Sequence, residues 1–240
     1  MKILAVDTTA KTATAALTED ERLLGLTVLN TPNTHSVTLL PMIDGILKGA
    51  AITVGDVELF VCSAGPGSFT GVRIGTAAVK GLAYSDKKPC VGVSALEALA
   101  LNVTAEDGVI CPVMDARRNQ LYNALFVHEG GSLKRLTPDR VITAQELAAE
   151  LKVTEKKIYL TGDGSDIAKR ALCQNNIAEL HEVLKYHNAY NVALLGYRTY
   201  MQASDGERAT FTCEKLSPVY LRASQAERER LERLEKENKS

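Results

Sequence analysis

The chain has 240 residues, of which 45% are hydrophobic, and a formal net charge of −1. This composition suits one large or two smaller packed domains and excludes a chain-wide electrostatic attraction to nucleic acid. The five cysteines are scattered and form no CxxC pair, so neither a disulfide framework nor a zinc site is expected. The apolar run Ile3–Val6 is too short for a signal peptide, and no run has membrane-spanning length. We therefore expect a cytoplasmic protein.

The first half of the chain predicts three strands followed by alternating helices and strands. In chain order the expected segments are strands Lys2–Asp7, Thr12–Leu17 and Leu23–Leu29, helix His35–Gly49, strand Leu59–Ser63, helix Val72–Tyr84, strand Cys90–Val93 and a helix from near Ser94.

The second half repeats this order. The expected segments are strands Val109–Asp115, Gln120–Val127 and about Lys134–Ile142, helix Ala144–Leu151, strand Ile158–Thr161, a helix from Ser165, a strand near Glu179–Leu184 and helix Asn191–Ala203. Each half is thus βββαβαβα in outline, which predicts an α/β fold of two lobes with mixed sheets flanked by helices.

The duplication has a second marker, because the first strand of each half ends in an aspartate, Asp7 or Asp115, followed by a tight hairpin. This layout is typical of the duplicated actin-like and sugar-kinase (ASKHA) superfamily, whose paired hairpins grip phosphates and metal between two lobes. We expect an N-terminal lobe over 1–103, a C-terminal lobe over 104–222 whose end is able to pack back on the first, and a charged tail over 223–240.

Neither hairpin contains glycine. The eight hairpin residues are Thr8, Thr9, Ala10, Lys11, Ala116, Arg117, Arg118 and Asn119. Their side chains should crowd a polyphosphate, since close backbone approach normally needs glycine. We therefore expect no nucleotide binding at Asp7 or Asp115, for which hydrogen bonding within the hairpin is an alternative role to ligand contact. We also expect one of Arg117 and Arg118 to pair with a carboxylate of the chain and the other to face the cleft or a partner.

The stretch Gly65–Gly75, GPGSFTGVRIG, lies between an expected strand and an expected helix. Such a turn offers backbone N–H groups to an anion, but it matches neither common phosphate-binding fingerprint. Arg73 falls in the first turn of the expected helix, where the helix dipole disfavours a cation, and this indicates more than a structural role. A plain glycine-rich helix entry is the alternative.

Five motifs occur in a fixed order. They are VDTT at the start, HSVTLLPMID at His35–Asp44, GPGSFTGVRIG, DARRNQLYNALF at Asp115–Phe126 and PVYLR at Pro218–Arg222. Together they resemble the TsaB family, also called YeaZ, from Met1 to about Arg222. The resemblance implies a bacterial cytosolic protein needed to make threonylcarbamoyladenosine in tRNA beside the anticodon. It implies a non-catalytic scaffold or activator that dimerises with TsaD, the transferase, and recruits TsaE, a small ATPase. The resemblance leaves open whether this subunit touches tRNA itself.

The sequence favours this non-catalytic interpretation. The His-x-x-x-His metal motif of TsaD-type proteins falls on Ala95 and Leu99, which cannot bind a metal. The histidines lack ligand spacing and no peptidase motif is recognisable, so we expect no catalytic residue, metal or cofactor. The alternative is an ATP-dependent small-molecule kinase or ATPase of the same superfamily, which GDG at Gly162–Gly164 favours mildly and the glycine-free hairpins oppose.

Two of the expected helices, Ser36–Gly49 and Val72–Tyr84, are apolar on more than one side. Such helices are either fully buried or packed against a partner protein. The resemblance favours the partner: a homodimer when the protein is alone, and a TsaD heterodimer that excludes it. The expected contact residues are Val37, Leu40, Ile43, Leu47, Arg73, Gly75, Thr76, Ala78, Val79 and Leu82. In the tail, Ser224 and Glu227 form a possible capping box, which predicts a solvated helix or, alternatively, a docking segment for the partner.

Overall fold

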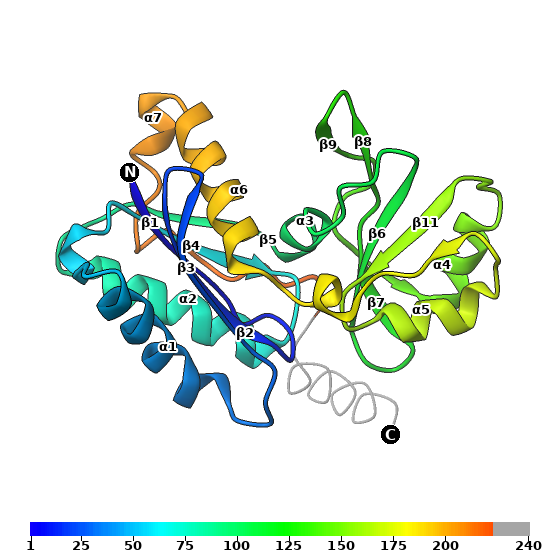
Figure 1. Cartoon of the computed structure of the whole chain (residues 1–240), viewed down its shortest axis with the longest axis horizontal. Coiled ribbons are helices and arrows are strands. Elements are labelled where there is room, and N and C mark those ends of the chain that lie inside the picture. Colours follow the sequence, from blue (N-terminus) through cyan, green and yellow to red (C-terminus); the bar gives the residue numbers. More distant parts are fainter. Residues whose placement is uncertain (223–240) are drawn as a thin grey trace, which may run out of the picture.

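Two α/β lobes, each built on one mixed β-sheet, lie side by side (Figure 1). The computed structural model describes residues 1–222, so the expected capping box of Ser224 and Glu227 lies outside the described residues. The predicted fold class is confirmed, because both lobes carry the same strand order with two antiparallel and two parallel neighbours.

The first sheet has the order β3-β2-β1-β4-β5. Its strands are β1 (Lys2–Asp7), β2 (Ala13–Glu19), β3 (Arg22–Leu29), β4 (Leu59–Gly65) and β5 (Cys90–Ser94). Alternate residues of β1 point to opposite faces of the sheet. Leu4 and Val6 join the core under α1 (His35–Gly49) and α2 (Phe69–Tyr84), whereas Ile3 joins the core under α6 (Ala189–Gln202).

The second sheet has the order β10-β7-β6-β11-β12, with β8 and β9 attached beside β6. Its strands are β6 (Gly108–Asp115), β7 (Gln120–Asn123), β8 (Phe126–Glu129), β9 (Ser132–Arg135), β10 (Arg140–Thr143), β11 (Lys157–Thr161) and β12 (Ile177–Ala178). Side chains of α4 (Ala144–Leu151) and α5 (Ser165–Leu172) pack on one face of this sheet. The short α3 (Ala95–Ala100) packs on the other face.

Two expected strands of the second lobe are each broken in two. Gln120–Val127 is interrupted after Asn123, and Lys134–Ile142 is interrupted after Arg135. At the break, Leu125 N donates to the Thr137 side chain at 2.8 Å, and the Leu125 carbonyl accepts from Leu136 N at 2.7 Å. Pro138 in the second gap has no N–H for a ladder. The long strands were therefore a wrong prediction, because side-chain and turn bonds replace the ladder there.

The strand expected near Glu179–Leu184 is also corrected. The structure has a two-residue strand, β12, followed by a short 3₁₀ helix over Glu182–Lys185. The Leu184 carbonyl accepts from Thr161 Oγ1 at 2.6 Å and from Asn102 Nδ2 at 3.0 Å. Side chains rather than a neighbouring strand satisfy this backbone, so no ladder forms.

Two helices occupy the space between the sheets (Figure 1). α6 follows the second lobe in the chain but packs on β1, β2, β4 and β5 of the first sheet, while α3 packs on β6 of the second sheet. They contact each other, and Asn191 Nδ2 of α6 donates to the Ala98 carbonyl of α3 at 3.0 Å.

The chain then returns along the first lobe. It passes through the short α7 (Asp205–Arg208), and Val219 N donates to the Ala64 carbonyl at 2.7 Å. This C-terminal segment reaches the cleft between the lobes at Arg222, which donates to the Ala116 carbonyl of the second lobe.

Candidate functional site

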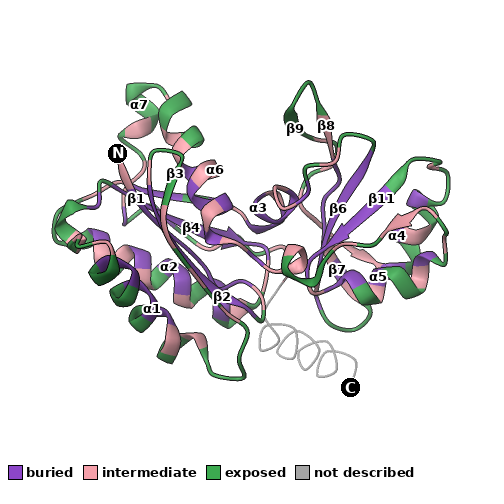
Figure 2. Ribbon diagram, viewed as in Figure 1, coloured by how far each residue is buried: buried purple, intermediate pink, exposed green. Residues whose placement is uncertain are grey.

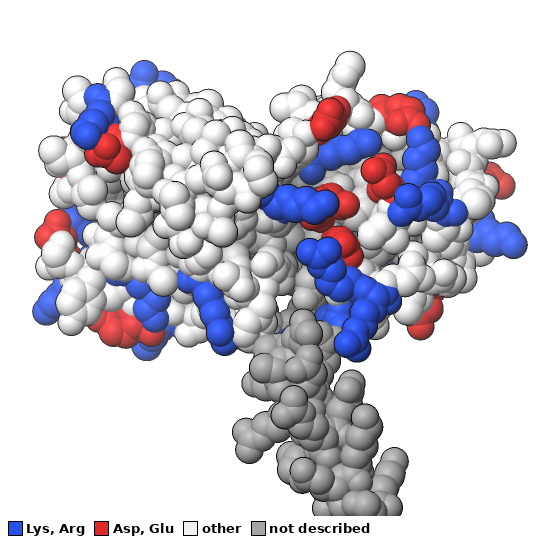
Figure 3. Space-filling model, turned by 90° about the horizontal axis from the view of Figure 1, so that it is seen from below, with Lys and Arg blue, Asp and Glu red and all other residues white. Residues whose placement is uncertain are grey.

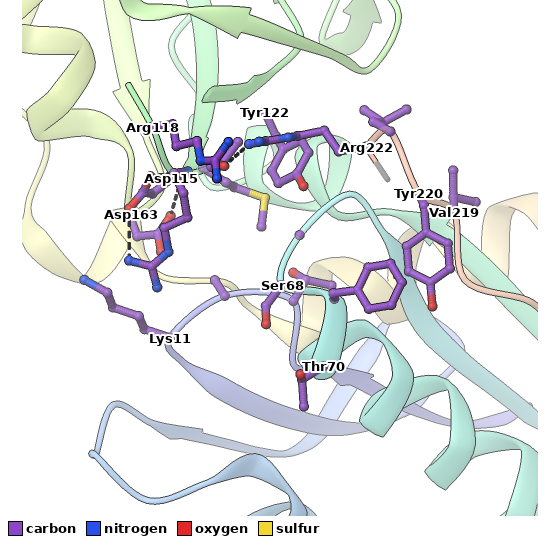
Figure 4. A pocket seen from close by; sticks show the side chains of 18 residues that line it. Lys11, Ser68, Thr70, Asp115, Arg118, Tyr122, Asp163, Val219, Tyr220 and Arg222 are labelled. Carbon is purple, nitrogen blue, oxygen red and sulfur yellow. Dashed lines mark hydrogen bonds and ion pairs between the residues drawn. The ribbon is translucent and has the colours of Figure 1, made fainter. Parts of the chain in front are cut away.

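A cleft of about 500 Å³ lies between the lobes (Figure 4). The hairpin after β1, the hairpin after β6, the start of α2 and the C-terminal segment all contribute to its walls. Its lining residues include Lys11, Ser68, Asp115, Arg118, Asp163 and Arg222. The structure therefore brings both predicted aspartate hairpins to one place, with Asp115 in the wall and Asp7 behind it.

Asp7 is buried at the end of β1, and both of its carboxylate oxygens accept hydrogen bonds from the chain. Oδ1 accepts from the N–H and the hydroxyl of Thr9, at 2.8 and 2.7 Å. Oδ2 accepts from Ser63 Oγ at 2.5 Å and from His187 Nδ1 at 2.9 Å. Thr8 Oγ1 donates to the Gly71 carbonyl at 2.7 Å. Hydrogen bonding within the hairpin, the alternative role for Asp7, is therefore confirmed.

Asp7 and His187 form a buried ion pair. Burial raises the pKa of Asp7, but the charge and hydrogen bond of His187, with the bonds from Ser63 and Thr9, hold that pKa below its usual value. Burial lowers the pKa of His187, but the charge and hydrogen bond of Asp7 outweigh it and leave the pKa raised. Both shifts favour the imidazolium–carboxylate form over the neutral pair.

The order of groups in this cluster is not that of a hydrolase. The carboxylate of Asp7 lies between Ser63 and His187, whereas nucleophile activation needs the imidazole to accept from the hydroxyl. Thr9 Oγ1 lies 3.5 Å from His187 Nδ1 but donates to Asp7 Oδ1 at 2.7 Å. His187 therefore positions and neutralises a carboxylate. The sequence did not reveal this role, because no motif joins two residues so far apart in the chain.

The second hairpin has a strained backbone. Arg117, Arg118 and Asn119 have φ angles of 65°, 56° and 57°, a left-handed run that costs each non-glycine residue roughly 1–2 kcal/mol. Asp115 stabilises the turn, because its Oδ1 accepts from Arg117 N at 2.7 Å. Arg117 Nη1 also lies 3.6 Å from Asp115 Oδ2, while Arg118 lines the cleft. The expected carboxylate pairing falls to Arg117 and the expected cleft position to Arg118, although Arg117 lines the cleft as well.

The glycine-rich stretch serves close packing of the first hairpin. α2 begins at Phe69, and Ser68 caps it by accepting from Gly71 N at 3.3 Å. A β-carbon on Gly71 would lie 2.0 Å from the Thr8 carbonyl oxygen. Ser68 N, at the entry to α2, donates to the Thr9 carbonyl at 2.7 Å. These contacts favour the plain structural alternative over an anion cradle.

Arg73 lies in the second turn of α2, not the first, because Ser68 starts the helix earlier than expected. Its guanidinium lies 4.1 Å from the Phe69 ring centroid, and its Nε donates to Tyr220 Oη at 2.8 Å. Tyr220 stacks on Phe69 with a centroid distance of 4.2 Å. Arg73 thus anchors Tyr220 of the PVYLR motif to α2.

The expected contact set on α1 and α2 divides in two. Ile43, Leu47, Gly75, Thr76 and Val79 are buried in the chain's own core, and this part of the set is corrected. The error arose because one helix face must cover the sheet, and sequence alone does not say which.

The other five residues reach the surface. They are Val37 and Leu40, exposed by 67% and 53%, the exposed Arg73, and the half-buried Ala78 and Leu82. Figure 2 shows the outer side of α1 exposed and its inner side buried. We call Val37, Leu40, Ala78 and Leu82 the α1–α2 face.

The positions aligned with a metal motif lie in the core. Ala95 and Leu99 are both fully buried on α3 among apolar neighbours. Within residues 1–222 there is no group of three or more His, Cys, Asp or Glu side chains placed to hold a metal ion. Across the same residues, no helix combines the length and apolar character needed to cross a bilayer.

The repeated strand order, with one hairpin from each lobe beside a shared cleft, defines a protein of the actin-like and sugar-kinase (ASKHA) class. Residues 28–230 match the family model described as "TsaD: tRNA N6-adenosine threonylcarbamoyltransferase".

Similarity to known proteins narrows this class to one family. The tRNA threonylcarbamoyladenosine biosynthesis protein TsaB of Bacillus subtilis (strain 168) is 33% identical over 172 residues, 72% of this chain and 75% of that protein. The TsaB of Escherichia coli (strain K12) is 35% identical over 128 residues, 52% of this chain and 55% of that one. The structure of YeaZ from Pseudomonas aeruginosa superposes with a TM-score of 0.76 at 25% identity, covering 92% of this chain and 99% of YeaZ. The chain belongs to the TsaB (YeaZ) family of tRNA threonylcarbamoyladenosine biosynthesis proteins.

Proposed function

We propose that this protein is a non-catalytic subunit that supports threonylcarbamoyladenosine formation on tRNA by pairing with TsaD and helping to recruit TsaE. The observation that carries the proposal is the internal bonding of the cleft. Both oxygens of Asp7 accept hydrogen bonds, from Thr9, Ser63 and His187, so this carboxylate is not available to bind a metal or to act as a base. Asp115 accepts from the Arg117 N–H and lies beside the Arg117 guanidinium.

The α1–α2 face supports the pairing with TsaD. Val37 and Leu40 are large apolar side chains on the outer side of α1, and the neighbouring α2 carries the small, half-buried Ala78, which permits close approach. An exposed apolar surface of this kind on two packed helices suits a four-helix contact with a related subunit. The same face would form the homodimer, so the two assemblies would exclude each other.

The kinase alternative loses its main support in the sequence. Gly162 has φ +104°, and a β-carbon there would lie 2.1 Å from the Val113 carbonyl oxygen. Asp163 Oδ1 accepts from Asp115 N at 3.1 Å. GDG therefore supports the turn after β11 against β6, and we favour no second function.

The decisive experiment reconstitutes tRNA modification from purified TsaD, TsaE and this protein of one organism. We expect threonylcarbamoyladenosine only when all are present, with the donor supplied. Modification at full rate without this chain would refute the proposal. ATP hydrolysis by this chain alone would refute its non-catalytic part.

A further inference from the structure

Two cations of the cleft have no ion-pair or hydrogen-bond partner among the described residues. They are Lys11, from the hairpin of the first lobe, and Arg118, from the hairpin of the second. Both side chains are exposed, and Figure 4 shows them on the same side of the cleft. Two like charges from different lobes therefore line one cavity, and neither forms an ion pair with Asp115 or Asp163, the carboxylates of the same cavity.

The wall of the cleft as a whole is basic. Arg117 and Arg222 add to Lys11 and Arg118, against the two carboxylates Asp115 and Asp163. This excess contrasts with the net charge of −1 for the chain. Figure 3 shows basic side chains gathered where the two lobes meet. The two carboxylates already accept bonds from backbone N–H groups, so they oppose an anion less than free carboxylates would.

Aromatic rings lie in the same wall. Tyr220 keeps 40% of its surface exposed although Phe69 stacks on it, and Tyr122 lines the cleft as well. Rings beside cations are the combination that binds single-stranded nucleic acid, because bases stack on the rings while phosphates bind the cations. A cavity of about 500 Å³ has the size of a site for about one nucleotide, from which a strand would continue on either side.

We propose that this cleft binds a single-stranded segment of RNA, with phosphates on Lys11 and Arg118 and a base against Tyr220. The bound strand would bridge the two lobes, because its two cations come from different lobes. An acidic peptide would engage the cations but would leave the rings unused. The choice of RNA over a peptide rests on the proposed function in tRNA modification.

The test measures the binding of the full chain to a short fluorescein-labelled single-stranded RNA by fluorescence anisotropy over a series of salt concentrations. In the double variant Lys11→Ala/Arg118→Ala we expect affinity to fall on the order of tenfold at low salt. The plot of log affinity against log salt concentration should also become shallower. Its slope should fall in magnitude by about 1.4, which is about 0.7 for each phosphate contact removed. The matched control Lys152→Ala/Arg170→Ala removes one exposed lysine and one exposed arginine outside the cleft and should change neither value.

Two competitors separate RNA from other anions. An abasic strand of the same length should bind more weakly than RNA, since it offers no base to the rings. AMP and inorganic phosphate are the second kind of competitor. If either displaced the labelled RNA at concentrations as low as those at which unlabelled RNA does, the cleft would bind a small phosphate compound and the proposal would be overturned. Equal loss in both double variants would overturn it in favour of binding elsewhere.

Failure of this inference can be told apart from failure of the proposed function. A chain that is required for tRNA modification but binds no RNA overturns this inference and leaves the proposed function intact. A chain that binds RNA in the cleft but is dispensable for modification supports the inference and overturns the function.

Discussion

His187 and Asp7 are 180 residues apart in the chain, yet their side chains meet in the core of the first lobe. The sequence left two roles open for Asp7, ligand contact and hydrogen bonding within the hairpin, because an aspartate before a tight turn can bond the backbone two residues on. It gave no sign of the partner, since His187 lies in an irregular segment whose position depends on how α6 returns to the first lobe.

The first prediction concerns the pH dependence of stability. The pKa of His187 is raised above its usual 6.5, so its ionisation contributes stability that is fully present below pH 6.5 and is lost as pH rises through the folded pKa. The pKa of Asp7 is lowered from 3.8, so its contribution is lost as pH falls through the still lower folded pKa. Urea unfolding from pH 5 to pH 9 should therefore show the free energy of unfolding falling above pH 6.5.

In the variant His187→Gln, the decrease in the free energy of unfolding above pH 6.5 should disappear. At pH 6 the variant should be less stable than the unmodified protein by roughly 3–5 kcal/mol, because a buried carboxylate loses its counter-ion. The control His128→Gln removes a half-buried imidazole of the second lobe, whose Nε2 donates to the Val103 carbonyl at 2.8 Å. An unchanged pH profile in His187→Gln would contradict the assignment.

A second prediction concerns the strained hairpin. Arg118→Gly should raise the free energy of unfolding by roughly 0.5–1 kcal/mol, because glycine adopts the φ of 56° without a β-carbon penalty. Arg118→Ala keeps the β-carbon and should bring no such gain, which separates backbone strain from loss of charge. Denaturant unfolding of both variants measures the difference, and equal stabilities would show that no strain is relieved.

At the scale of elements, hydrophobic periodicity predicted α1 and α4 with the bounds that the structure shows. It failed for the broken strands of the second lobe, where Thr137 and Pro138 end pairing by side-chain and proline chemistry that leaves no periodic signal. It also did not separate the core side of α1 and α2 from the outer side, because both sides are apolar. The site residues Ile43 and Val79 were misplaced for that reason.

The third prediction tests the α1–α2 face. Leu40→Arg places a charge on a residue that is 53% exposed, so the variant should remain folded. Its self-association and its binding to TsaD should both weaken by roughly 3 kcal/mol, about a hundredfold, since the charge would be buried without a partner. Light scattering measures assembly and circular dichroism checks the fold.

Val153→Arg is the control, because Val153 is 86% exposed on the second lobe. If Leu40→Arg assembled with TsaD as tightly as Val153→Arg does, the α1–α2 face would not be the contact.

At the scale of the whole molecule, the repeated element order was sufficient to predict two equivalent sheets. The placement of α3 and α6 between them was not predictable, because it depends on long-range contacts: α3 contacts strands of both sheets, and α6 packs on the first sheet and on α3. Those long-range contacts, together with the residues leading to Arg222, build the cleft from parts far apart in sequence. The aspartate hairpins were predicted from local motifs, whereas the aromatic and basic walls required the assembled lobes.

The last prediction concerns nucleotide binding in that cleft. Thr8, Thr9 and Ser68 bond to the chain itself, so the first hairpin and the start of α2 have few free donors for a polyphosphate. The second hairpin places the Arg117 and Arg118 side chains where glycine would let a phosphate reach the backbone. Calorimetry of the isolated protein with Mg-ATP should therefore show binding no tighter than about 1 mM, roughly −4 kcal/mol. The phosphates of Mg-ATP are adjacent and partly neutralised by Mg²⁺, whereas an RNA strand presents separate phosphates along its backbone to the cations of the two lobes. Micromolar binding of Mg-ATP, reduced in Arg118→Ala, would instead mean that the cleft retains a nucleotide site.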